Sequence, residues 1–272
     1  MNDLLNPTKS INVILFVMVL FILLSDRALA IIGGEEAMEG EQEWVVGIAL
    51  ADEPNGYFAQ FCGGTLIHPE WILTAAHCTL DEDDIPFLST DLDILVGRTI
   101  LNSNDGQRVP VSKIIRHPGF ELLTYNNDIA LLRLSRPATS ETISLVGAQS
   151  LFSSPITDFA KVYGWGTDDS GYGANALNKA TLSIISQQDC ETIYREFGIL
   201  ISNNMLCAGL AQGGIDSCVG DSGGPLIRYN NGKSVQVGIV SWGLECGAAG
   251  LYGVYTNVVN YNSWIYFQIS SH

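Results

Sequence analysis

The apolar positions of the chain fall into short runs separated by turn-forming residues. Twelve runs of six to eight residues are rich in Val, Ile, Leu and aromatic residues, and Gly, Pro, Asn, Asp and Ser stand between them. Runs this short predict an antiparallel sandwich or barrel rather than alternating strands and helices. The runs are 44–50, 61–67, 71–77, 92–97, 108–115, 128–134, 158–164, 179–185, 204–209, 224–229, 235–242 and 253–258.

The runs divide six and six around a segment of different composition. Residues 135–157 are rich in Ser, Thr and Pro, which is typical of a linker. We therefore predict two all-β halves, 31–150 and 151–272, in one unit. Only the end of the chain has helical spacing, with one apolar face formed by Val258, Tyr261, Trp264, Ile265 and Ile269.

Residues 1–30 predict a secretory signal peptide. Lys9 lies in a polar start, an apolar run covers 13–24, and Ala28–Ala30 offers a small-residue cleavage site. This run is shorter than the roughly 20 residues that span a bilayer. We expect export, cleavage and no membrane association afterwards, and a retained anchor is the alternative.

Charge and cysteine content narrow the class of protein. The formal net charge is −16, and removing residues 1–30 leaves it unchanged because that segment holds two acidic and two basic residues. Such a charge repels nucleic acid. Six cysteines in an exported chain predict three disulfides, with 15 possible connectivities. No CxxC pair is present, so we expect no metal ion and no cofactor.

The stretch DSCVGDSGGP, residues 216–225, is the first candidate for chemistry. It places Ser222 between an acid and two glycines. A Gly-Ser-Asp cluster of this kind can be an ordinary turn. For Ser222 to act as a nucleophile, a base must take its proton and an acid must orient that base.

The candidate base is His77, which ends an apolar run in LTAAHC. His68 and His117 each precede a proline, and His272 is terminal. The candidate acid is Asp128, at the start of the run DIALLRL. Taken singly, His77 could be a structural histidine and Asp128 a residue bonded to the backbone at the start of a strand.

The motifs TAAHC, DIALL and GDSGGP occur in that order, together with IIGG, CGGTLI, GWG, SWG and GVYTNV. From Ile31 to the C-terminus this set resembles the trypsin-like family of serine peptidases. The resemblance implies two six-stranded antiparallel β-barrels with the catalytic site in the cleft between them. That fold agrees with the twelve runs.

By the same resemblance, Ser222 is the nucleophile and His77 the general base and then acid. Asp128 orients His77, and Ser241 adds a hydrogen bond to Asp128. The amides of Gly220 and Ser222 form the oxyanion hole. A catalytically inactive binding or scaffold protein on the same fold is the alternative, and such proteins typically lack one of these three catalytic residues.

The resemblance places Asp216, six residues before Ser222, at the base of the substrate pocket. A buried carboxylate there is paired only by a cation, so we predict a secreted endopeptidase that cleaves proteins or peptides after Arg or Lys. A surface turn is the alternative for Asp216. We also expect a monomer that can meet protein inhibitors of proteases. The substrate-binding residues are expected to be Asp216, Ser217, Ser241, Trp242, Gly243 and Gly253.

The resemblance also implies an activating ion pair between a free amine at Ile31 and Asp221. The preceding residue is Ala30 rather than Arg or Lys, and Arg27 lies three residues too early. We therefore expect signal peptidase to release the active terminus directly. Signal removal near Ser25 followed by a non-tryptic cut after Ala30 is the alternative.

The resemblance implies the disulfides Cys62–Cys78, Cys190–Cys207 and Cys218–Cys246. Segment 96–108 is short and carries Arg98, which argues against the family's calcium site. Tyr252 is associated with sodium-sensitive relatives, and Glu245 either repels acidic residues or faces solvent. The acidic stretch 79–93 is either a solvated face or a rim that favours basic peptides.

Overall fold

The computed structural model describes residues 31–147, 159–167, 173–230 and 233–272. The predicted signal peptide and the predicted boundary between the two halves lie outside the described residues.

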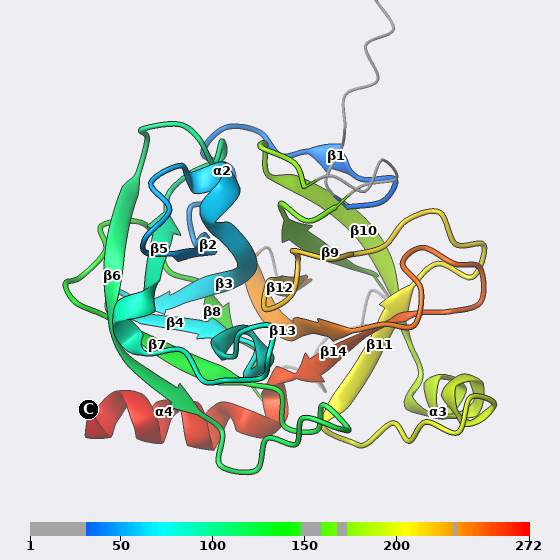
Figure 1. Ribbon diagram of the computed structural model, residues 1–272. Coiled ribbons are helices and arrows are strands. Elements are labelled where there is room, and N and C mark those ends of the chain that lie inside the picture. Colours follow the sequence, from blue (N-terminus) through cyan, green and yellow to red (C-terminus); the bar gives the residue numbers. More distant parts are fainter. Residues whose placement is uncertain (1–30, 148–158, 168–172, 231–232) are drawn as a thin grey trace, which may run out of the picture.

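Six strands of the N-terminal half close into a barrel (Figure 1). They pair antiparallel in the order β2-β3-β4-β7-β6-β5, and β5 returns to β2. The strands are β2 (Val45–Leu50), β3 (Gln60–His68), β4 (Trp71–Thr74), β5 (Leu92–Val96), β6 (Gln107–Arg116) and β7 (Ala130–Leu134).

A second antiparallel barrel lies beside the first. Its order is β9-β10-β11-β14-β13-β12, and β12 returns to β9. Its strands are β9 (Phe159–Gly164), β10 (Asn178–Ile185), β11 (Met205–Gly209), β12 (Pro225–Asn230), β13 (Lys233–Trp242) and β14 (Gly253–Asn257). The short strands β1 (Glu35–Glu36) and β8 (Ser144–Leu145) add to β10 and β13.

The predicted fold class is confirmed. Each of the twelve apolar runs overlaps one barrel strand, and the strands form two six-stranded antiparallel barrels followed by a C-terminal helix. Closing a barrel pairs every strand on both sides, which leaves no open sheet edge. Buried side chains then fill each interior, as Ile48 and Ile94 do in the first barrel and Val162 and Leu226 do in the second.

The C-terminal helix packs against the first barrel. A 3₁₀ turn, η4 (Val258–Tyr261), leads into α4 (Asn262–Ser271), which crosses below that barrel in Figure 1. The predicted apolar face is the one that is covered: Val258, Tyr261 and Ile265 are buried, and Trp264 and Ile269 pack on the same core.

The prediction that only the chain end is helical was wrong. Two further α-helices are present among the described residues. The helix α3 (Gln187–Arg195) precedes β11, and α2 (Gly56–Ala59) is a four-residue helix before β3. Only Cys190 and Tyr194 of α3 are buried, so its apolar pattern is too short to reveal a period. The sequence signal for α3 was a serine at the N-cap position, Ser186. Its hydroxyl accepts a hydrogen bond from the Asp189 amide in the first turn.

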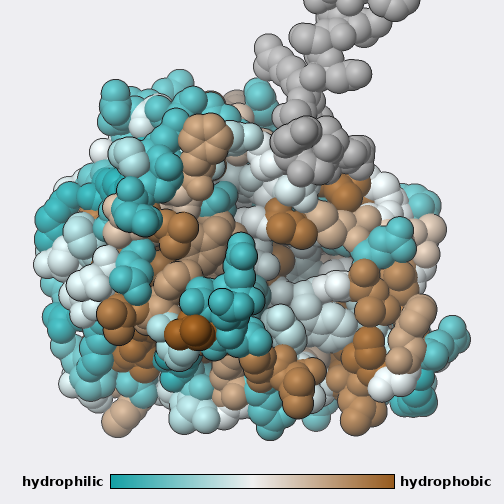
Figure 2. Space-filling view, in the orientation of Figure 1, coloured by the Kyte–Doolittle hydropathy of each residue, from teal (hydrophilic) through white to brown (hydrophobic). Residues whose placement is uncertain are grey.

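On the face shown in Figure 2, hydrophilic residues are frequent over the N-terminal barrel, and paler or hydrophobic ones gather over the C-terminal barrel. Among the described residues, no helix combines the length and the apolar character required to cross a membrane.

Candidate active site

His77 lies just beyond the end of a strand. The apolar run led us to place it in the strand itself, but β4 ends at Thr74 and His77 opens the 3₁₀ turn η1 (His77–Thr79). The correction has a local cause, because both the amide and the hydroxyl of Thr79 donate to the carbonyl of Ala76 and bend the chain out of the ladder.

Asp128 also lies outside its predicted strand. β7 begins at Ala130, and Asn127 has φ 57, a left-handed conformation that Asn adopts more readily than most residues. The Ile129 amide donates to the Asn127 carbonyl, so the chain turns tightly at Asp128 before it enters the sheet. The turn aims a fully buried carboxylate at η1.

The carboxylate of Asp128 joins His77 to Ser241. Its Oδ1 accepts from the His77 amide at 2.9 Å, and its Oδ2 lies 2.8 Å from His77 Nδ1. The Ser241 hydroxyl donates to the same Oδ2 at 2.5 Å. These contacts select the imidazole tautomer with the proton on Nδ1, which leaves Nε2 free to accept a proton.

Ser222 reaches the first barrel through its backbone. Its carbonyl accepts from the Gly63 amide of β3 at 2.7 Å. The next residue, Gly223, has φ +79, and a Cβ there would lie 2.2 Å from Thr74 Oγ1, so only glycine fits this turn.

The hydroxyl of Ser222 makes no hydrogen bond within the described residues. His77 Nε2 lies 3.7 Å from the Sγ of Cys78. The structure therefore joins His77, Asp128 and Ser241 by hydrogen bonds and brings in Ser222 through the contact of its backbone with β3. Catalytic hydrogen bonds are often long in free enzymes and shorten when substrate binds.

Two backbone amides of the loop that carries Ser222, one of them its own, have no partner within the described residues. The amides of Gly220 and Ser222 donate to no acceptor in the described part of the chain. Gly220 has φ +93, and the Nε2 of Gln60 on β3 donates to its carbonyl at 3.0 Å. Two free amides in one turn can bind a negatively charged oxygen when they point to the same place.

All six residues predicted to bind substrate line one cavity, and Ser222 lines it with them. The cavity has a volume of about 300 Å³. A Cβ on Gly243 would meet no atom within 4 Å, whereas a Cβ on Gly253 would lie 3.0 Å from Asp216 Oδ1. Gly243 therefore leaves open space, and Gly253 allows the chain to pass close to the carboxylate. The full lining is Asp216, Ser217, Cys218, Val219, Ser222, Val240, Ser241, Trp242, Gly243, Leu244, Glu245, Cys246 and Gly253.

Asp216 is the buried acid of this cavity. Its two oxygens accept from the amides of Ser217 at 2.9 Å and Gly247 at 3.1 Å. Burial raises its pKa from 3.8 to about 6, against the opposing effect of these two bonds. Among the described residues it pairs with no cation, so it can receive one from a ligand.

Asp221 is fully buried next to Ser222. Its carboxylate accepts from the amides of Gly166 at 2.8 Å and Cys218 at 2.9 Å. Burial raises its pKa from 3.8 to about 7. Ile31 is buried among the residues of the second barrel's core, still joined to Ala30 by a peptide bond. No ion pair between Ile31 and Asp221 is present in the described part of this uncleaved chain.

The structure joins Cys62 to Cys78, Cys190 to Cys207 and Cys218 to Cys246. The first disulfide links β3 to η1, and the third borders the cavity. In the described residues, one group of three potential metal ligands occurs, formed by Cys62, His77 and Cys78. Both sulfurs belong to the disulfide, so neither is a thiolate that could bind a metal.

Two carboxylates of the acidic stretch 79–93 accept hydrogen bonds from backbone amides of the same stretch. Asp81 accepts from the amides of Asp83 and Ile85, and Asp91 accepts from the amide of Leu88. These carboxylates stabilise turns, as short acidic side chains commonly do. In segment 96–108, Arg98 donates to the Leu101 carbonyl at 2.9 Å and places a cation inside the loop.

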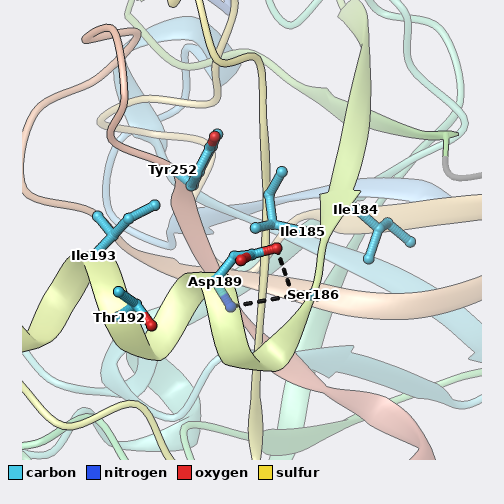
Figure 3. Close-up of a pocket in the computed structure, with 7 residues that line it drawn as sticks. All are labelled: Ile184, Ile185, Ser186, Asp189, Thr192, Ile193 and Tyr252. Carbon is cyan, nitrogen blue, oxygen red and sulfur yellow. Dashed lines mark hydrogen bonds between the residues drawn. The ribbon is translucent and has the colours of Figure 1, made fainter.

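A second cavity, of about 420 Å³, lies between α3 and β10, away from the cavity that Ser222 lines (Figure 3). Three isoleucines and Tyr252 line it with Ser186, Asp189 and Thr192. Figure 3 shows that the polar groups of Ser186 and Asp189 bond to each other at the start of α3. This cavity contains no predicted catalytic residue. The carbonyl of Tyr252 accepts from the Tyr194 hydroxyl.

Two residues of the site were not predicted. The ring of Tyr125 lies edge-on to His77, with centroids 5.4 Å apart, and Thr256 donates to the carbonyl of Asp128 at 2.6 Å. Thr256 belongs to the motif GVYTNV, but no spacing rule indicates a hydrogen bond to a distant carbonyl.

Comparison with known proteins agrees with this geometry. Residues 31–265 match the family described as Trypsin. A trypsin of Saccharopolyspora erythraea is 35% identical over 242 residues, which cover 89% of this chain and 99% of that protein. Coagulation factor IX of Oryctolagus cuniculus is 36% identical over 88% of this chain and 85% of that protein. An ovochymase of Halocynthia roretzi is 37% identical over 88% of this chain but only 15% of its own length. The chain therefore belongs to the trypsin family of chymotrypsin-fold serine peptidases.

Proposed function

We propose that this peptidase is an exported endopeptidase that cleaves proteins and peptides after Arg or Lys. The observation that carries the specificity is Asp216, a carboxylate in the same cavity as Ser222 and without a cationic partner among the described residues. An arginine side chain can bind a carboxylate through two parallel hydrogen bonds, and lysine can reach it as a point charge.

In the proposed mechanism, the Ser222 Oγ attacks the carbonyl carbon of the scissile bond while His77 Nε2 takes its proton. The amides of Gly220 and Ser222 bind the oxyanion that forms. His77 then donates the proton to the leaving amine, the C–N bond breaks, and an acyl-enzyme remains. Water deprotonated by His77 hydrolyses this ester. Asp128 stabilises the imidazolium in both steps.

Hydrolysis of matched peptide esters tests the proposal. The secreted protein should cleave esters with Arg or Lys before the scissile bond and leave those with Phe or Ala nearly untouched. Ser222→Ala should lower kcat on the Arg ester by about 10⁶-fold. A preference for Phe or Ala would overturn the specificity, and activity in the Ser222→Ala protein would overturn the role of Ser222.

We also propose that one cleavage, after Ala30, both completes export and creates the active terminus. Support comes from the small residues Ala28–Ala30 and from Asp221, which is fully buried without a cation in the described part of the uncleaved chain. A free amine at Ile31 would supply that cation. N-terminal sequencing of the secreted protein should begin at Ile31, and any other start would exclude the direct route.

A further inference from the structure

We propose that Thr256 is a positioning residue for catalysis, which holds Asp128 in place relative to His77 through the main chain. This inference rests on the proposed function. Asp128 forms hydrogen bonds through both its side chain and its main chain. The carboxylate bonds to His77 and Ser241, and the main-chain carbonyl accepts a hydrogen bond from the Thr256 hydroxyl at 2.6 Å. The second contact has no direct part in proton transfer, but it determines where the carboxylate lies.

The carbonyl of Asp128 needs this partner. Asp128 lies in the turn before β7, so its carbonyl has no place in the ladder, and the residue is fully buried. Among the described residues, the Thr256 hydroxyl is the donor that bonds to it. An unpaired buried carbonyl is costly, so without this bond the turn would move to find another donor.

Thr256 is well suited to act as a fixed point. It is 2% exposed and lies inside β14, paired with Met205 of β11 and Ile239 of β13. Its β-branched side chain has few rotamers. The hydroxyl therefore has a position set by the second barrel, and it holds a residue of the first barrel.

Besides its own two bonds to Asp128, His77 has support that does not involve that residue. Thr79, in the same 3₁₀ turn, donates to the Ala76 carbonyl at 2.6 Å and accepts from Arg116 Nε at 2.5 Å. These bonds lie within the first barrel. Loss of the Thr256 hydroxyl should therefore displace Asp128 more than it displaces the turn that carries His77. The two bonds between the Asp128 carboxylate and His77 are then strained, which changes the geometry of the pair.

The experiment compares Thr256→Val, which removes the hydroxyl at nearly constant volume, with Thr256→Ser, which keeps it. Thr192→Val, on the exposed side of α3, is the matched control. We expect Thr256→Val to lower kcat on the Arg ester by about 10- to 100-fold with little change in KM. Thr256→Ser should keep most of kcat, and Thr192→Val should match the unmodified enzyme.

The pH profile separates positioning from a general structural role. A displaced Asp128 stabilises the His77 imidazolium less, so the acid limb of kcat/KM should move to lower pH in Thr256→Val. Among the described residues, Tyr125 and Tyr261 lie near the pair, and burial raises the pKa of both, so they stay neutral in this range. Arg116, which donates to Thr79, stays charged, and Asp84 acts on the pair only from beyond Tyr125.

Binding of benzamidine, a small cation for the Asp216 cavity, shows whether each variant is folded. If the Val variant does not fold, Thr256→Ala removes the same hydroxyl and takes its place. The inference is overturned if the hydroxyl-free variant keeps the unmodified kcat, if Thr256→Ser loses as much activity, or if the acid limb does not move. An unmodified enzyme that hydrolyses no ester would instead overturn the proposed function.

Discussion

Asp216 and Asp221 are two buried carboxylates of one loop, and they differ in what they face. Each carboxylate accepts hydrogen bonds from two backbone amides. Burial raises the pKa of Asp216 to about 6 and that of Asp221 to about 7. Asp216 lines a cavity, whereas the Asp221 oxygens lie against the backbone of Gly164 and Gly166. The first can therefore receive a cation from a substrate, and the second only from the chain itself.

The largest expected effect comes from removing the charge in the cavity. Asp216→Ser should lower kcat/KM on the Arg ester by about 10³-fold, because the substrate cation is then buried without a partner. Activity on an Ala ester, which places no charge there, should change little. Equal losses on both esters would mean that Asp216 supports the loop rather than recognising the substrate.

Asp221→Asn tests the other carboxylate and should be less selective. In the proposed mature protein the Ile31 amine pairs with Asp221, and without that charge we expect the amides of Gly220 and Ser222 to lose their fixed orientation. We expect kcat to fall by about 10²-fold on Arg and Ala esters alike. A loss confined to the Arg ester would show that the two carboxylates do not have separate roles.

The barrel strands could be predicted because each one carries its own signal, a short apolar run between turn residues. The helix α3 carries no such periodic signal, since Cys190 and Tyr194 are its buried residues, and its one signal is the cap at Ser186. The motifs singled out His77, Asp128 and Ser222, but the local structure around His77 and Asp128 depends on individual turn residues beside them. The left-handed Asn127 and the bonds of Thr79 place His77 and Asp128 outside their strands, and neither follows from periodicity.

In the protein that begins at Ile31, the pH dependence of ligand binding should follow the titration of Asp216. A carboxyl group with a pKa of about 6 loses its charge as the pH falls through that value. The affinity for benzamidine should therefore be constant above pH 7 and fall about tenfold per pH unit below 6. Titration calorimetry from pH 8 to pH 4 measures this. The weak binding of Asp216→Ser should not vary with pH, and an equally flat profile for the unmodified protein would contradict the assignment.

The smallest effect should be a pH-dependent difference in stability between a protein that begins at Ala28 and one that begins at Ile31. In the longer protein Asp221 is unpaired, with its pKa raised from 3.8 to about 7, so the folded state binds more protons than the unfolded state between these values. Its free energy of unfolding should therefore fall as the pH rises through that window.

In the protein that begins at Ile31, the amine favours the charged carboxylate and removes this loss. Asp216 is the same in both proteins, so its own contribution cancels when their melting temperatures are compared. We expect the Tm of the longer protein to fall by about 5 °C more than that of the shorter one between pH 5 and pH 8. Asp221→Asn in the longer protein should abolish the difference. Parallel melting curves for both proteins at every pH would mean that the Ile31 amine does not reach Asp221.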